Sequence, residues 1–222
     1  DLNVIDVFYK GKLVDRNAPI RVKTCGRALK HTVHLDKVKA EQFVLPIGKK
    51  KIHVIGINPS QITTEDLAVS LPPAANYVPT DGYSKVAAVE RHHNTGIRNG
   101  AVASSVSHDS HNIIVIGDND RDMALAVDEI IRTQGGYTVV ENGEVFETLP
   151  LPIMGLMSDA GFESVNETLG RMIKKAHEMG VPADIEPFIT LSFLALPVIP
   201  TLRITPRGLC LLTAKGPEIL QE

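Results

Sequence analysis

The sequence predicts an α/β or α+β domain in which a mixed β-sheet, preceded by a small β-hairpin segment, is covered by at least two helices. Three observations predict this class. Short β-branched apolar runs recur along the chain, two longer stretches carry apolar residues at helical spacing, and Asn142-Gly143 separates two strand-like runs. With 222 residues, of which 43% are apolar, the chain can bury one large core or two small ones.

Composition argues against several kinds of partner. The formal net charge is −3, whereas nucleic acids and membrane surfaces attract basic faces, so we expect neither as a partner. Cys25 and Cys210 provide neither a disulfide framework nor metal-ligand spacing, which is typical of a reducing cytoplasm. No apolar run reaches the roughly 18 residues that a transmembrane helix needs. We therefore expect a cytoplasmic protein.

The first elements are a hairpin and a less regular stretch. Two strand-like runs, Val4–Tyr9 and Leu13-Val14, flank Gly11, which can supply the positive φ of a tight turn. A chain that opens in the middle of a sheet is expected either to be cut from something larger or to have a short natural N-terminus. Next, His31–Leu35 alternates weakly, and Asp36–Phe43 has a helical pattern that Asp36 could cap.

The middle of the chain predicts strands. Each of these runs is short, rich in β-branched or small apolar residues, and bounded by turn or polar residues. They are Lys50–Ile57, Thr64–Leu71, Val86–Val89, Ala101–Val106 and Ile113–Ile116.

The last hundred residues contain the two predicted helices, Asp120–Gln134 and Gly161–Met179, each with apolar residues on one face. Between them, Tyr137–Val140 and Glu144–Leu149 predict a hairpin about Asn142-Gly143. The apolar run Pro187–Pro200 fits either a strand or a helix. The predicted sheet ends with two further strands, Leu202–Ile204 and Leu209–Leu212.

Two polar clusters stand at the ends of predicted strands, where proteins often place binding groups. Buried polar side chains need hydrogen-bond partners or a ligand, so such clusters are candidate sites. The first cluster separates two apolar strands and consists of His108, Asp109, Ser110, His111 and Asn112. The second follows the strand that ends at Val89 and consists of Glu90, Arg91, His92 and His93.

Spacing limits what these histidines can do together. His108 and His111 are three residues apart, so they share a face on a helix but lie on opposite faces of a strand. Metal ligation by both would need a turn at Asp109-Ser110. His92 and His93 point to opposite faces of an extended chain. Either cluster could contact a substrate or belong to a structural hydrogen-bond network, and the Glu90-Arg91 pair could be an ordinary ion pair.

Four blocks of sequence resemble the C-terminal domain of bacterial and archaeal adenine deaminases, which belong to the amidohydrolase superfamily. Their order matches across nearly the whole chain. The blocks are VERHHNTG at Val89–Gly96, NGAVASSVSHDSHNIIVIG at Asn99–Gly117, LPLPIMGLMSD at Leu149–Asp159 and LSFLALPVIPTLRIT at Leu191–Thr205.

The resemblance implies two domains. The opening hairpin, residues 1–20, resembles the end of the small β-domain that flanks an amidohydrolase barrel, and residues 21–222 would form the C-terminal domain. In the family an upstream barrel, absent from this chain, binds two divalent metal ions, typically manganese or iron. The implied activity is hydrolysis of adenine to hypoxanthine and ammonia in a homo-oligomeric protein. The fragment alone is expected to bind no metal and to be inactive.

The resemblance also turns the polar clusters into candidate site residues. We expect His108, Asp109 and His111 to assist catalysis and no residue of this chain to bind metal. The expected substrate-binding residues are Ser110, Asn112, Glu90, Arg91, His92 and His93. In related sequences a glycine-rich segment lies between the counterparts of Gly96 and Ile97. We therefore expect that residues are missing at this junction, rather than that the protein lacks the loop.

Two alternatives stay open. The chain could be a structural or oligomerisation module in which the polar clusters make hydrogen bonds at interfaces. It could also be an independent metallohydrolase that uses His92, His93, His108 and His111, with Asp109 orienting a ligand. The positions of the two polar clusters discriminate between these alternatives. A shared, exposed concave site would favour a role in catalysis or binding, whereas burial in separate parts of the core would favour a structural role.

Overall fold

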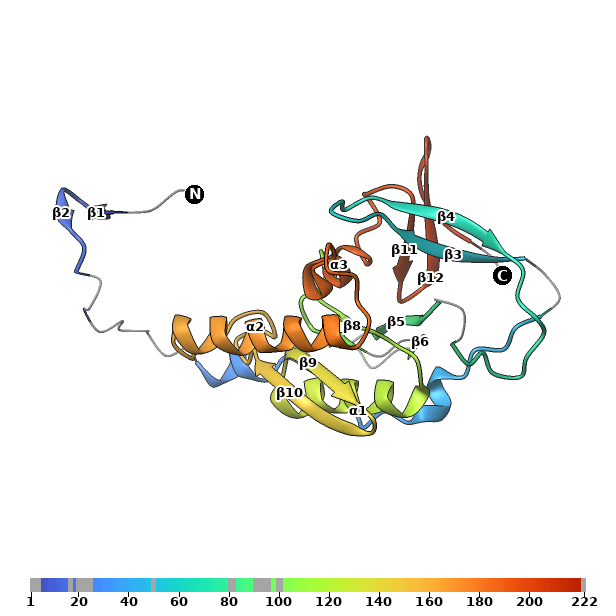
Figure 1. The fold of residues 1–222 in the computed structure, drawn as a ribbon, viewed down its shortest axis with the longest axis horizontal. Helices are drawn as coiled ribbons and strands as arrows, with labels where there is room; N and C mark the ends of the chain where they lie inside the picture. Colours follow the sequence, from blue (N-terminus) through green and yellow to red (C-terminus); the bar gives the residue numbers. More distant parts are fainter. Residues whose placement is uncertain are drawn as a thin grey trace.

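A computed structural model describes residues 5–15, 18, 26–48, 51–79, 83–89, 97–98 and 102–220 (Figure 1). The predicted junction between Gly96 and Ile97 lies outside these residues, because Gly96 is not described. Within the described residues, no helix is both long and apolar enough to cross a membrane.

The central sheet has six strands in the order β10-β9-β7-β8-β5-β6. The sequence predicts a mixed sheet. Every strand pair within the described part of this sheet is antiparallel. The predicted α+β class, with helices covering a sheet, is confirmed. The strands are β5 (Lys85–Val89), β6 (Ile97–Arg98), β7 (Ala103–Ser104), β8 (Ile113–Gly117), β9 (Gly136–Glu141) and β10 (Glu144–Pro150).

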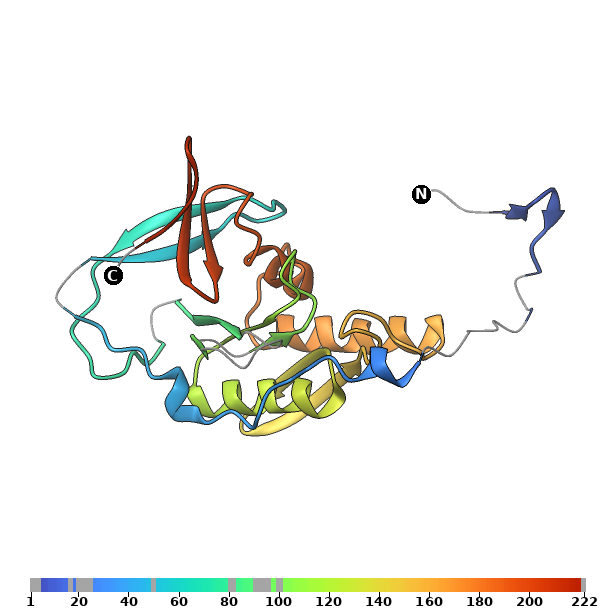
Figure 2. The same cartoon turned by 180° about the vertical axis from the view of Figure 1, so that it is seen from behind.

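The helices cover both faces of this sheet, because successive side chains of β8 point to opposite sides. Ile113 and Val115 pack in one core cluster with residues of α1 (Asp120–Thr133), whereas Ile114 packs with residues of α3 (Pro187–Phe193). The third helix, α2 (Phe162–Glu178), buries Met172 against Val139 and Leu149 of the hairpin β9-β10. Both predicted helices are confirmed. Figure 2 shows α1 and α2 on different sides of the sheet.

Two smaller sheets lie beyond α3. The two predicted strands β3 (Ile52–Ile57) and β4 (Thr64–Val69) are confirmed, and they pair with each other. The other sheet contains β11 (Leu202–Thr205), β12 (Gly208–Thr213) and β13 (Gly216–Ile219). The sheets are joined by Thr64, whose Oγ1 donates to the carbonyl of Leu202 over 2.7 Å. β13 was not predicted, because Gly216-Pro217-Glu218 lacks an apolar pattern and pairs through its backbone with β12.

The stretch before β3 differs from the prediction. His31–Leu35 forms no strand, and Asp36–Phe43 contains only a short 3₁₀ helix, η2 (Ala40–Phe43). The physical reason is tertiary. Val38 N donates to Asp128 Oδ1 on α1 over 2.7 Å. In a local helix this backbone N–H would bond to a carbonyl within the helix, whereas here a side chain of α1 satisfies it.

The opening hairpin forms as predicted, from β1 (Phe8–Tyr9) and β2 (Lys12–Leu13), with Gly11 at φ 74° in the turn. Its large apolar side chains are exposed, Phe8 by 65% and Leu13 by 60%. Figure 1 shows the hairpin well apart from the rest of the molecule.

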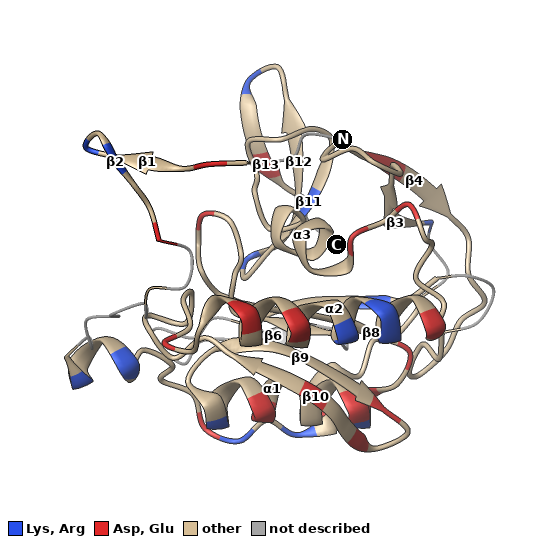
Figure 3. Cartoon of the chain, turned by 60° about the vertical axis from the view of Figure 1, so that its left-hand side comes forward, with Lys and Arg blue, Asp and Glu red and all other residues tan. Residues whose placement is uncertain are grey.

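Figure 3 shows acidic and basic residues interspersed along α1 and α2, so these helices carry no strip of a single charge.

Candidate functional site

The first polar cluster lies in the connection between β7 and β8, as the sequence predicts. The two strands are adjacent and antiparallel, with Ala103 opposite Val115 and Ser104 opposite Ile114. β5 flanks β8 on its other side, and its last residue, Val89, lies opposite Ile113. The strand that leads into the second cluster therefore ends beside the strand that leaves the first.

The second cluster itself lies outside the described residues. Glu90, Arg91, His92 and His93 follow Val89 directly in the chain, and their roles stay predictions. The register of β5 and β8 sets Val89, which precedes the second cluster in the chain, opposite Ile113, which follows the first cluster.

Within the first cluster, the residues divide into an exposed turn and a buried base. The turn bends at Asp109-Ser110, and His111 N donates to the carbonyl of Ser107 over 2.7 Å. The side chain of Asp109 is 87% exposed and that of His108 is 45% exposed. His111 is half-buried, and Asn112 is buried. The turn that joint use of the two histidines would need is therefore present.

Helix α3 supports this turn from the other side. The helix begins at Pro187, whose ring suits the first helical position, and the side chain of Glu186 accepts a hydrogen bond from the backbone of Ile189 as a cap. At the end of the helix, His108 N donates to the carbonyl of Ser192 over 3.1 Å. The His108 ring stacks on Phe193, with ring centroids 4.8 Å apart and planes inclined by 18°.

Ser192 and Phe193 were missed as site residues. They lie more than 80 positions from His108 in the sequence, and their apolar surroundings predict core packing. The block Leu191–Thr205, which carries part of the family resemblance, was a signal that could have found them.

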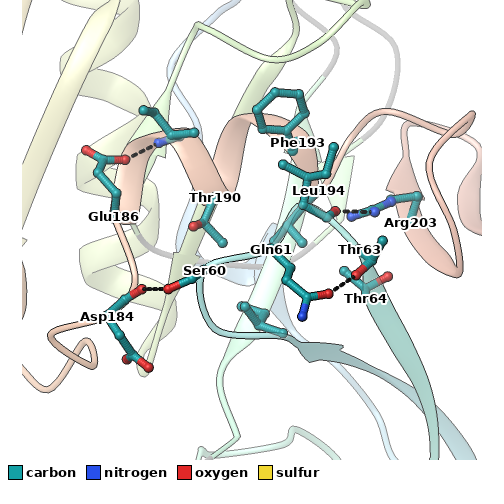
Figure 4. Close-up of a pocket in the computed structure, with 13 residues that line it drawn as sticks. Ser60, Gln61, Thr63, Thr64, Asp184, Glu186, Thr190, Phe193, Leu194 and Arg203 are labelled. Atoms are coloured by element: carbon teal, nitrogen blue, oxygen red, sulfur yellow. Dashed lines mark hydrogen bonds between the residues drawn. The ribbon is translucent and has the colours of Figure 1, made fainter.

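A cavity of about 230 Å³ is lined in part by Phe193 (Figure 4). The β3-β4 turn, α3 and the segment before it, and β11 form its walls. Figure 4 shows Asp184 and Glu186 on one side and Arg203 on the opposite side. The lining residues are Ile57, Ser60, Gln61, Ile62, Thr63, Thr64, Asp184, Glu186, Ile189, Thr190, Phe193, Leu194 and Arg203.

The charged groups of this cavity are perturbed by burial. Burial raises the pKa of Glu186, while the backbone N–H groups of Ile189 and Phe188 partly oppose that shift. Burial lowers the pKa of the Arg203 guanidinium, which is 1% exposed. Arg203 donates from Nε to the Ile199 carbonyl over 2.9 Å and from Nη2 to the Ile62 carbonyl over 2.6 Å. It therefore ties the β3-β4 turn to the segment before β11.

The described residues do not fit a divalent metal site. Within them, no group of three or more His, Cys, Asp or Glu side chains is placed to hold a metal ion. His108, Asp109 and His111 therefore do not form such a group by themselves. The hypothesis of an independent metallohydrolase would depend on His92 and His93, which are not described.

These features define an antiparallel α+β domain in which a polar loop is held against a short helix. Residues 61–215 match the family model of the adenine deaminase C-terminal domain. The chain belongs to this family, and the resemblance inferred from the sequence is confirmed.

Several curated relatives have the same name, adenine deaminase. The protein from Desulfitobacterium hafniense is 48% identical over 215 residues, and that from Nitratidesulfovibrio vulgaris strain DP4 is 44% identical over 220 residues. Adenine deaminase 2 from Carboxydothermus hydrogenoformans is 40% identical over 220 residues. Each match covers 91% of this chain but only 38% or 39% of the relative. The chain thus spans less than half the length of these relatives.

Proposed function

We propose that this chain is the C-terminal part of a metal-dependent adenine deaminase, which hydrolyses adenine to hypoxanthine and ammonia. The observation that carries the proposal is the family match over residues 61–215, joined by relatives of that name at up to 48% identity. In this reaction an oxygen from water replaces the C6 amino group of adenine, and the amino group leaves as ammonia after proton transfer.

We place the divalent metal, manganese or iron, in a barrel upstream of this chain. A bound divalent metal supplies hydroxide at neutral pH. The described residues offer no ligand set for such a metal, so the roles proposed for this chain do not include metal ligation. The 222-residue chain alone is expected to bind no catalytic metal and to show no turnover.

The role proposed for this chain is to present polar groups to a site that the upstream barrel completes. His108, Asp109 and Ser110 can be reached from outside, since the side chains of His108 and Asp109 are 45% and 87% exposed and Ser110 is exposed. The stack on Phe193 limits the orientations of the His108 ring, which suits proton handling or a contact with a purine. His111 and Asn112 lie deeper and would position this turn. The remaining substrate-binding candidates are Glu90, Arg91, His92 and His93.

The opening hairpin supports the proposed division into domains. Phe8, Tyr9 and Leu13 are exposed on a two-stranded hairpin, and isolated hairpins are marginally stable in water. We assign residues 1–20 to a small β-domain that the upstream part of the protein completes, and residues 21–222 to the C-terminal domain. We also propose that the complete protein is a homo-oligomer.

A structural role is the second candidate. The hydrogen bond from His108 to Ser192 and the stack on Phe193 are contacts within the domain, and they would hold the β7-β8 connection without any chemistry. In that case the polar turn would be an interface or packing feature of an oligomerisation module.

The experiment that separates these candidates uses the full-length protein. Adenine conversion to hypoxanthine and ammonia should be observed, should stop when a chelator removes the metal, and should return with manganese or iron. His108→Ala and His111→Ala should each reduce kcat while the melting temperature stays nearly unchanged. His34→Ala, an exposed histidine on the segment along α1, is the matched control.

Three outcomes would count against parts of the proposal. Absence of adenine hydrolysis in the metal-loaded protein would refute the activity. Equal losses of stability and activity in both variants would favour the structural role. Wild-type rates in both variants would remove His108 and His111 from the site.

A further inference from the structure

The part of the block Leu149–Asp159 that follows β10, residues 151–159, forms a loop that carries two methionines on the surface. Met154 is 43% exposed and Met157 is 53% exposed, although methionine usually packs in cores. Two other large apolar side chains are exposed: Leu29, at 43%, whose carbonyl accepts a hydrogen bond from Met154 N, and Phe162, at 69%, which begins α2 after the loop. We call these four residues the methionine surface.

Backbone contacts hold the loop in a conformation in which Met154 and Met157 are exposed. Gly135 and Gly155 approach so closely that a Cβ on Gly135 would lie 2.3 Å from the Cα of Gly155. Ser105 Oγ donates to the Gly155 carbonyl over 2.5 Å. Ile153 and Met157 also bond to each other through their backbones, at 3.0 and 3.1 Å.

The four side chains belong to one region of the molecule. Met154 N donates to the carbonyl of Leu29. Leu29 belongs to η1 (Arg27–Lys30), the first described helix of the chain. An ion pair joins Lys30 to Asp159, three residues before Phe162. Figures 1 and 2 show η1 beside the N-terminal end of α2.

The position of this surface indicates what covers it. The chain enters the body of the domain at η1, which contains Leu29 and bonds to Met154. An upstream domain would therefore be tethered at this edge. The relatives, of which this chain covers about 38%, are longer than this chain, and the matched family is a C-terminal domain. Burial of exposed apolar side chains is favourable, and methionine adapts its shape to a partner surface.

We propose that the methionine surface is the docking face for the domain that precedes this chain in the full-length protein. The inference takes the existence of that upstream domain from the proposed function, and adds where the two parts meet. The opening hairpin, with its exposed apolar residues Phe8 and Leu13, precedes η1 in the chain and therefore lies between the upstream domain and this surface in the sequence.

The five methionines of the chain provide an internally controlled test by oxidation with hydrogen peroxide and mass spectrometry of the full-length protein. Met179 is the exposed control, at 41% in this chain and at the opposite end of α2 from Phe162, and Met172 is the buried control. Met154 and Met157 should be oxidised several-fold more slowly than Met179, at rates closer to that of Met172. Oxidation of Met157 as fast as Met179 would overturn the proposal.

A second variant and a dilution series distinguish the possible occupants. Met157→Glu should restore fast oxidation of Met154 and lower the melting temperature of the full-length protein, whereas Met179→Glu should do neither. Protection that disappears on dilution together with an oligomer would show a second copy on this surface and would refute an intramolecular contact. The adenine assay on the same preparation tests the proposed function separately, because a protein without deaminase activity can still protect Met157.

Discussion

The His108 ring stacks on Phe193, with the ring centroids 4.8 Å apart, and so joins the β7-β8 connection to α3. Stacked aromatic pairs contribute about 0.5–1.5 kcal/mol beyond the area that they bury, and they restrict ring orientation. If the imidazole acts in the full-length enzyme, its orientation depends on Phe193.

We therefore expect Phe193→Leu to lower kcat in the full-length protein, because the His108 ring loses its stacking partner. A double-mutant cycle with His108→Ala measures this dependence. The double variant should be no slower than His108→Ala alone. Independent, multiplicative losses would show that Phe193 acts without His108, for instance through the cavity that it lines.

A second prediction concerns the buried ammonium of Lys85, which is 3% exposed and begins β5. Its Nζ donates to Asp120 Oδ1 over 2.5 Å, to Asn76 Oδ1 over 2.8 Å and to the Phe43 carbonyl over 3.1 Å. Lys85→Met should lower the free energy of unfolding by about 3 kcal/mol, since it leaves a partly buried carboxylate without its cation.

Urea unfolding of the 222-residue chain measures that change. Lys37→Met is the matched control, because Lys37 is 86% exposed and lies 3.8 Å from Asp128, so its loss should cost well under about 1 kcal/mol. Adding Asp120→Asn to Lys85→Met should recover part of the stability. No recovery would mean that the lysine is required for packing and not for charge pairing.

A third prediction concerns Gly135, which follows α1 at φ 119°. Gly135→Ala should destabilise the chain through both backbone strain and the clash with Gly155. Gly180→Ala is the control, because Gly180 has a similar φ of 109° but no atom within 4 Å of a new Cβ. Strain alone costs about 1–2 kcal/mol, so thermal or urea unfolding should show a clearly larger loss at Gly135. Equal losses would mean that the loop around Gly155 moves away without cost.

A fourth prediction is a pH dependence of stability. Arg132 donates two hydrogen bonds to Glu129, at 2.7 and 2.6 Å, and thereby lowers the pKa of that carboxyl below its ordinary value. A lowered folded-state pKa stabilises the native state above the unfolded-state pKa. That stabilisation is lost as the pH falls through the folded-state pKa.

Glu129→Gln should therefore reduce stability at neutral pH, by no more than about 1 kcal/mol because Arg132 is mostly exposed. The difference from the unsubstituted chain should shrink as the pH falls below the usual range of a glutamate. Glu144→Gln, an exposed residue at the start of β10, controls for the loss of one negative charge. A difference that stays constant down to acidic pH would exclude the proposed pairing as its cause.

Local patterns determined most of the elements. The apolar spacing in α1 and α2, the Asn142-Gly143 turn and the runs that became β3, β4, β5 and β8 are properties of neighbouring residues, and each was predicted within a few positions. The location of the first polar cluster between β7 and β8 follows from the same patterns, because a polar segment between two apolar strands forms their connection. The order of four sequence blocks also sufficed to indicate the family before any geometry was known.

Tertiary contacts decided the rest. Residues 31–39 satisfy backbone groups with Asp128 and Gln134 of the α1 region, which no local pattern could show, and β13 forms because β12 offers it an edge. The partnership of His108 with Phe193 joins residues that are remote in the chain and appears only after the sheet brings α3 beside β8. Secondary structure depends on periodicities that span a few residues, whereas a site depends on distances between elements, and only the packed core sets those distances.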